Sequence, residues 1–134
     1  MLFAFDITIP ANTLESAPTL ETLKIAAGVI TNIAIKFPSG CHGLVKVRIR
    51  HEETQIYPIP RGEWVTGDDE TVPAEYYYDM GKASKELEFI AISPDTTYDH
   101  TITVRITILP LSVVSPLKVM EDLVAILKRI LGIK

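Results

Sequence analysis

The sequence predicts an all-β fold, an antiparallel β-sandwich of jelly-roll-like type, followed by a C-terminal amphipathic α-helix. Residues 1–110 alternate apolar and polar side chains with a period of two, and turn residues interrupt the alternation repeatedly. No helical period appears before Pro110, so the crossover helices of parallel α/β folds are missing. The immunoglobulin hallmark of two cysteines around a core tryptophan is also missing. Strand number and a long early loop favour a jelly roll, and other sandwich topologies stay open.

The first half of the chain contains four predicted strands, residues 3–9, 23–25, 33–37 and 45–49. Pro10 ends the first strand, and residues 11–19 are predicted as an irregular loop. Gly28 permits a turn after the second strand, and a Pro-Ser-Gly turn at 38–40 closes the third. In the fourth, Lys46, Arg48 and Arg50 form a basic row opposite an apolar face. Because the net charge is negative, we interpret this row as a solvated strand face.

The second half continues the same pattern. A short segment at 56–59 carries Pro58 and is predicted at a sheet edge. Strands are also predicted at 75–79, at 87–91, which is apolar on both faces, and at 102–108, before Pro110. The total is roughly seven to nine short strands, typical of a sandwich.

Residues 111–134 form a second part, a linker and a helix. Ser115 is predicted to cap the helix, Pro116 to begin it and Gly132 to end it. Its apolar residues recur at three- and four-residue steps in two adjacent stripes. One stripe contains Leu117, Met120, Val124, Leu127 and Leu131, and the other contains Val119, Leu123, Ile126 and Ile130.

Leaving nine apolar side chains in water would forfeit on the order of 10 kcal/mol. Three arrangements could cover them: packing against the chain's own sandwich, association with copies or another protein, or a membrane interface. Two apolar stripes suit a bundle of three or more helices, so we expect association. The predicted association residues are Leu117, Met120, Leu123, Val124, Leu127, Ile130 and Leu131.

Composition limits the function classes. The chain has 134 residues, a net charge of −4 and a pI near 5.3, which argues against nucleic acid or anionic membranes as partners. We see no signal peptide and no apolar run of about 18 residues, so the expected location is cytoplasmic, or a virion for a viral protein. One glutamine and two asparagines suggest a heat-adapted source.

Aromatic residues are the main candidates for ligand binding. Period-two alternation places Tyr77 on the face opposite Tyr76 and Tyr78, so at least one tyrosine is expected to be exposed. Together with Trp64, flanked by Arg61 and Glu63, these tyrosines could hold a sugar ring or a partner protein.

We interpret the cysteine, the histidines and the acidic residues as structural. Cys41-His42 is predicted as a turn with a small buried thiol, and the acids of residues 67–70 as a solvated loop. His100 is predicted to open the last strand, with Asp95 or Asp99 as candidate partners. We therefore expect no catalytic residues, no metal site and no cofactor.

Three short segments carry a resemblance to a known class of proteins. They are the strand at residues 3–10 leading into Ala11-Asn12-Thr13, Phe37-Pro38-Ser39-Gly40 before the strand at 44–50, and Asp99-His100-Thr101 before the strand at 102–109. Residues 3–110 resemble small β-sandwich proteins of virus and bacteriophage particles, such as decoration, cement or turret components. The resemblance implies a non-enzymatic homo-oligomer, a trimer or pentamer, on a capsid surface.

The leading hypothesis is a structural protein of a virion that self-associates through its C-terminal helix, as a trimer or larger, with another capsid protein as a further partner. The alternative is a carbohydrate-binding module that uses Trp64 and Tyr76 to Tyr78. A cupin-like enzyme is disfavoured because its histidine cluster is missing.

Overall fold

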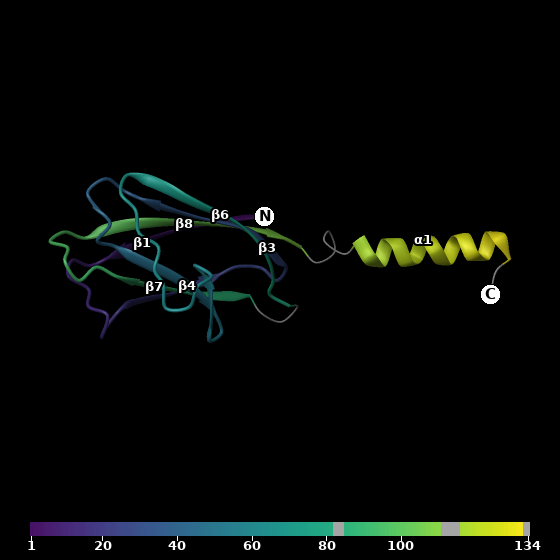
Figure 1. Ribbon diagram of the computed structural model, residues 1–134, viewed down its shortest axis with the longest axis horizontal. Helices are drawn as coiled ribbons and strands as arrows, with labels where there is room; N and C mark the ends of the chain where they lie inside the picture. Colours follow the sequence, from purple (N-terminus) through teal and green to yellow (C-terminus); the bar gives the residue numbers. More distant parts are fainter. Residues whose placement is uncertain (82–84, 111–115, 133–134) are drawn as a thin grey trace.

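Among the described residues, two antiparallel four-stranded sheets face each other and one helix follows them, in the computed structural model shown in Figure 1. The structure describes residues 1–81, 85–110 and 116–132, and for residues 116–122 it describes the backbone alone. The strands are β1 (Leu2–Ile9), β2 (Thr19–Lys24), β3 (Val29–Phe37), β4 (Lys46–His51), β5 (Thr54–Tyr57), β6 (Glu70–Asp79), β7 (Glu86–Ile92) and β8 (His100–Leu109). The helix is α1 (Pro116–Leu131).

The strand order identifies a jelly roll. One sheet has the order β1-β8-β3-β6 and the other β2-β7-β4-β5. Strand pairs form between β1 and β8, β2 and β7, β3 and β6, and β4 and β5, all antiparallel. These four pairings describe one long antiparallel ribbon that is rolled so that alternate pairs enter alternate sheets. The predicted antiparallel, jelly-roll-like sandwich is therefore confirmed.

The apolar residues of the period-two pattern form the core between the two sheets. In β8, Ile102, Val104 and Ile106 are fully buried, while Thr101 and Arg105 on the other face are exposed. The largest side chains in this core include Phe37 of β3, Phe89 of β7 and Tyr57 of β5. Burial of such apolar faces is the main stabilising term of a sandwich.

Several predicted strands have different bounds in the structure. β2 and β3 each begin four residues before the predicted strand, at Thr19 and Val29, so Thr19 belongs to β2 and not to the predicted loop. β6 begins at Glu70, five residues before the predicted strand, and so includes Pro73. An edge strand tolerates proline because one side of its backbone has no ladder partner, and β6 is at the edge of its sheet. β5, predicted at 56–59, ends at Tyr57, so Pro58 lies beyond it, and β5 is an edge strand as predicted.

Helix α1 follows the sandwich at the end where β8 finishes. Figure 1 shows it apart from both sheets. Gly132 has a φ of 71° and follows directly after the helix, as expected for a glycine that ends one. The predicted cap Ser115 and the rest of the linker at 111–115 lie outside the described residues. Among the described residues, no helix has the length and apolar character needed to cross a bilayer.

Candidate functional site

The first candidate site is the apolar face of α1. Six of its described apolar residues are exposed, with accessible fractions between 48% and 73%. They are Leu123, Val124, Ile126, Leu127, Ile130 and Leu131. At about 100° of rotation per residue, these six lie on one half of the helix circumference, and Ala125, Lys128 and Arg129 lie on the other. The side chains of Leu117 and Met120, predicted for the same face, lie outside the described residues.

The second candidate site consists of Trp64 and the tyrosines 76–78, and the fold places these residues on different surfaces. Tyr76 and Tyr78 turn inward from β6 and pack against the core, whereas Tyr77 is 76% exposed on the outer face of that strand. Tyr76 contacts the ring of Tyr57 at a centroid distance of 6.0 Å, and Tyr78 contacts His51. Burial raises the pKa of both inward tyrosines. At least one tyrosine of the run is exposed, as the alternation predicts.

Trp64 belongs to the other sheet. Its neighbour Val65 pairs with Val47 of β4, and the guanidinium of Arg48 lies 3.9 Å from the centroid of the Trp64 ring. Such a cation–π contact places Trp64 over the outer face of β4, where Arg48 alternates with the inward Val47. Tyr77 is on the outer face of the opposite sheet. Trp64 and Tyr77 therefore do not form one binding surface.

The basic row of β4 is partly neutralised. Arg50 forms an ion pair with Glu88 of the neighbouring strand β7, in direct cross-strand register. Arg48 is engaged with Trp64, and a small cavity of about 240 Å³ lies between Arg48, Arg50 and Arg61. This arrangement agrees with the interpretation of a solvated strand face.

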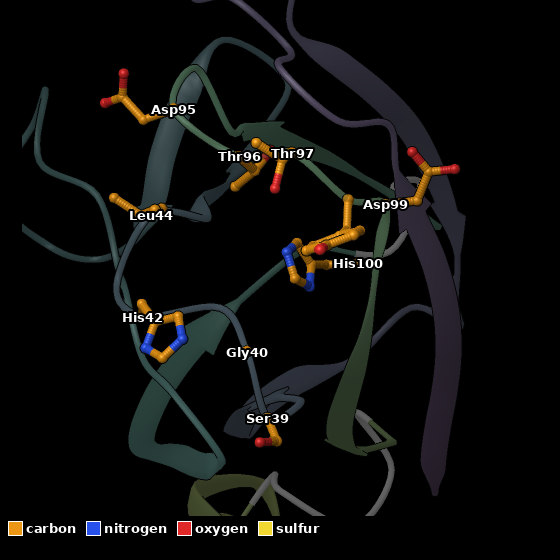
Figure 2. Close-up of a pocket in the computed structure, with 10 residues that line it drawn as sticks. Ser39, Gly40, His42, Leu44, Asp95, Thr96, Thr97, Asp99 and His100 are labelled. Carbon is orange, nitrogen blue, oxygen red and sulfur yellow. The ribbon is translucent and has the colours of Figure 1, made fainter.

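A larger pocket of about 400 Å³ opens at the end of the sandwich where β8 begins, which is the end away from α1. Two connections form it, residues 39–44 between β3 and β4 and residues 95–99 between β7 and β8, together with His100 at the start of β8. These connections are distant in the sequence, and the pairing of β3 with β8 brings them together. Figure 2 shows the rings of His42 and His100 on two sides of the pocket, with the carboxylates of Asp95 and Asp99 turned away from its centre.

Hydrogen bonds hold both connections in place. The backbone N–H of Ala11 donates to Asp99 Oδ1 at 2.8 Å, and the backbone N–H of Asn12 donates to the Thr96 hydroxyl at 3.0 Å. The Thr96 hydroxyl donates in turn to the Ser93 carbonyl at 2.9 Å. Asp99 thus pairs with the early loop and not with His100. His100 opens β8 as predicted.

The acidic loop is tied to the first of these connections. Asp68 Oδ1 accepts a hydrogen bond from the backbone N–H of Gly40 at 3.0 Å, and Asp68 Oδ2 lies 3.5 Å from His42 Nδ1. The backbone N–H of His42, together with those of Gly40 and Cys41, lowers the pKa of Asp68 against the effect of desolvation. Glu70, predicted in the loop, is the first residue of β6.

Cys41 matches the prediction of a small buried thiol. Cys41 is fully buried in the core, and burial, followed by the nearby Asp68 charge, raises the pKa of its thiol. A thiol of this kind is a poor nucleophile. Within the described residues, no group of three or more His, Cys, Asp or Glu side chains is arranged to hold a metal ion.

Sequence reasoning missed the pocket because neither connection has a recognisable motif. One signal was present: Tyr98, a large aromatic residue in the connection between β7 and β8, is 74% exposed and lines the pocket. Turn residues with large aromatic side chains are candidates for ligand contact because loops carry most binding groups.

Comparison with known proteins identifies no family. No protein-family model matches the chain, and no curated protein matches it. Among solved structures, the chain is similar to one titled "Crystal Structure of FLHE", with 15% sequence identity and a TM-score of 0.39. That match covers 78% of this chain and 95% of the other. A likeness at this level supports no argument about function.

Proposed function

We propose that this chain is a non-enzymatic structural protein that associates with copies of itself through the apolar face of α1, as a trimer or a larger assembly. The observation that supports the proposal is the exposure of the six described apolar residues of that face. Full burial of such side chains is worth about 1.5–3 kcal/mol each, so covering this face would contribute on the order of 10 kcal/mol. Exposed apolar surface of this extent is typical of an interface.

A second copy of the chain suits this face better than a membrane surface does. The apolar residues occupy about half of the helix circumference, wide enough to contact two neighbouring helices at once. The described part of α1 carries no aromatic residue to anchor in a lipid interface, and the whole chain has a net charge of −4. A bundle of three or more helices would bury both edges of the face.

The biological setting proposed for this assembly is the surface of a virus particle, with another capsid protein as a further partner. The resemblance of residues 3–110 to virion β-sandwich proteins supports it, and the jelly-roll topology is consistent with it. The proposed location is the virion, or the cytoplasm for a cellular protein.

A heat-adapted source is also proposed from the scarcity of glutamine and asparagine. Calorimetry tests it, because proteins of moderate-temperature organisms unfold with midpoints of about 45–65 °C. A midpoint above about 75 °C is expected, and one within the moderate range would contradict a heat-adapted source.

Native mass measurement tests the assembly role. Light scattering on the full chain should give a trimer or larger, and a chain that ends after Pro110 should be a monomer. Circular dichroism of the shortened chain checks that its strands are retained. A full chain that remains monomeric at micromolar concentration would contradict the proposal, as would a shortened chain that keeps the full oligomeric state.

The alternative function, a carbohydrate-binding surface built from Trp64 and Tyr76 to Tyr78, has less support. Tyr76 and Tyr78 pack against the core, and Trp64 and Tyr77 lie on opposite outer faces of the sandwich. A glycan screen with Trp64→Ala and Tyr77→Ala variants tests this alternative directly.

A further inference from the structure

The pocket formed by residues 39–44 and 95–100 is lined by a largely buried histidine whose ring nitrogens remain accessible from the pocket. His100 is 9% exposed, and its ring makes no hydrogen bond or ion pair with any of the described residues. Figure 2 shows this ring turned into the pocket. Because these nitrogens are not used in a hydrogen bond with the described residues, they are available to pair with a bound molecule.

The other groups of the pocket define the chemistry of that molecule. The hydroxyls of Ser39 and Thr97 and the imidazoles of His42 and His100 can each donate or accept a hydrogen bond. A ligand with hydroxyl groups matches such a lining because hydroxyls also both donate and accept. The Thr96 hydroxyl is not available, since it already bonds to Asn12 and Ser93.

Charges near the pocket argue against an ionic ligand. Asp95 and Asp99 lie at its rim, and Asp68 lies 3.5 Å from His42, so an anion would meet three nearby carboxylates. An ammonium ion would need a carboxylate partner inside the pocket, whereas the carboxylates of Asp95 and Asp99 are turned away from its centre. A divalent cation would need a cluster of ligands that the described residues do not provide. The pocket therefore fits a neutral ligand better than a charged one.

Tyr98 supplies a flat surface next to these polar groups. Its side chain is 74% exposed although it lines the pocket, so its ring is open to contact by a bound molecule. Aromatic rings provide apolar contact area at low entropic cost, and sugar rings have apolar faces that stack on them. The pocket volume of about 400 Å³ falls in the range of small-molecule sites, about 300–1,000 Å³.

We propose that this pocket binds a neutral carbohydrate, with one sugar ring stacked on Tyr98 and its hydroxyl groups hydrogen-bonded to His100, Ser39 and Thr97. The site is distinct from the surface considered around Trp64. It is independent of the assembly role, because it is at the end of the sandwich away from α1.

Saturation-transfer NMR on the full chain tests the proposal, since this method detects weak ligands even on large assemblies. The probes are neutral pyranoses and their disaccharides, each compared with the uronate of the same ring. We expect transfer to neutral sugars. Because of the carboxylates near the pocket, the matching uronate should bind several-fold more weakly, with the difference reduced by added salt.

Matched variants locate the site. Tyr98→Ala should weaken binding about tenfold, and Tyr98→Phe should stay within about twofold because the ring is kept. Tyr77→Ala is the control, since Tyr77 is equally exposed but lies on the outer face of β6, away from the pocket. Absence of transfer to every neutral sugar, tighter binding of the uronates, or equal loss in Tyr98→Ala and Tyr77→Ala would each overturn the proposal.

Discussion

His51 Nδ1 lies 2.7 Å from the hydroxyl of Tyr78, and this hydrogen bond joins the end of β4 in one sheet to β6 in the other. The two rings meet edge to face, with centroids 5.5 Å apart and an angle of 83° between their planes. His51 is 8% exposed, so the bond replaces hydration that the imidazole loses on folding. A polar link of this kind fixes the spacing of the two sheets at this end of β4.

Removing the hydroxyl tests the strength of this link. Tyr78→Phe should lower the free energy of unfolding by about 1 kcal/mol, because it deletes one partner of a buried polar group and keeps the ring contact. Urea denaturation measures the change. Tyr77→Phe, on the exposed face of the same strand, is the matched control and should change stability by less than about 0.5 kcal/mol. Equal effects of the two substitutions would contradict the assigned role of the hydrogen bond.

Alkaline pH should destabilise the fold through its buried tyrosines. Burial, with a smaller contribution from Tyr76, raises the pKa of Tyr57 well above its usual value, and burial also raises the pKa of Tyr76 and Tyr78. In the unfolded chain a tyrosine releases its proton near pH 10, whereas the folded chain keeps it. Above about pH 10 the unfolded state therefore binds fewer protons, and the free energy of unfolding falls as the pH rises. Below that pH the contribution is complete and constant.

The Tyr57→Phe variant isolates the largest part of this dependence. Its free energy of unfolding, measured in urea from about pH 8 to pH 11, should fall less steeply than that of the wild type. Tyr77→Phe should follow the wild-type profile. Parallel profiles for Tyr57→Phe and the wild type would show that ionisation of Tyr57 is not coupled to unfolding.

The strands could be predicted where a strand has one buried and one solvated face. β8 and β4 follow the alternation of their sequences almost residue by residue. The first half of β6 could not be predicted in this way, because Pro73 and the acids before it are typical of loops. A strand tolerates these residues here because β6 is at the edge of its sheet. Local sequence does not reveal which strand is at an edge.

The candidate sites were less predictable than the strands. Alternation within β6 separates Tyr77 from its two neighbours, but it does not reveal that Trp64 belongs to the opposite sheet. The pocket depends on the register of β3 against β8, where Lys36 pairs with Thr103, and that register follows from the complete topology. Burial of His100 against the connection at residues 39–44 is a consequence of the same pairing.

Gly28 lies between β2 and β3 at a close approach of two backbone segments. A Cβ atom there would lie 2.3 Å from the carbonyl oxygen of Leu109, and the φ of 153° is rarely adopted by other residues. Gly28→Ala should therefore reduce stability by more than about 2 kcal/mol, since a backbone atom must move. Gly62→Ala is the control, because Gly62 also has a positive φ but has open space around it.

Comparing the stability of the two variants separates the steric clash of a Cβ atom at Gly28 from the cost of a positive φ. Gly62→Ala should cost about 1–2 kcal/mol, the usual penalty for a side chain in a left-handed conformation. Thermal unfolding of both variants gives the comparison. If Gly28→Ala were no less stable than Gly62→Ala, the close approach of Gly28 to Leu109 would have no energetic significance.

Single charges placed on the two faces of α1 test the proposed assembly in the full chain. Leu127→Glu inserts a carboxylate into the apolar face, whereas Ala125→Glu inserts the same side chain into the opposite face. Burying an unpaired charge between helices is unfavourable by several kcal/mol, so Leu127→Glu should shift the native mass toward the monomer. Ala125→Glu should leave the mass unchanged, and both variants should keep the thermal unfolding of the sandwich. Because the new residue is identical in both, a loss of assembly in Ala125→Glu as well would assign the effect to net charge and contradict a specific apolar interface.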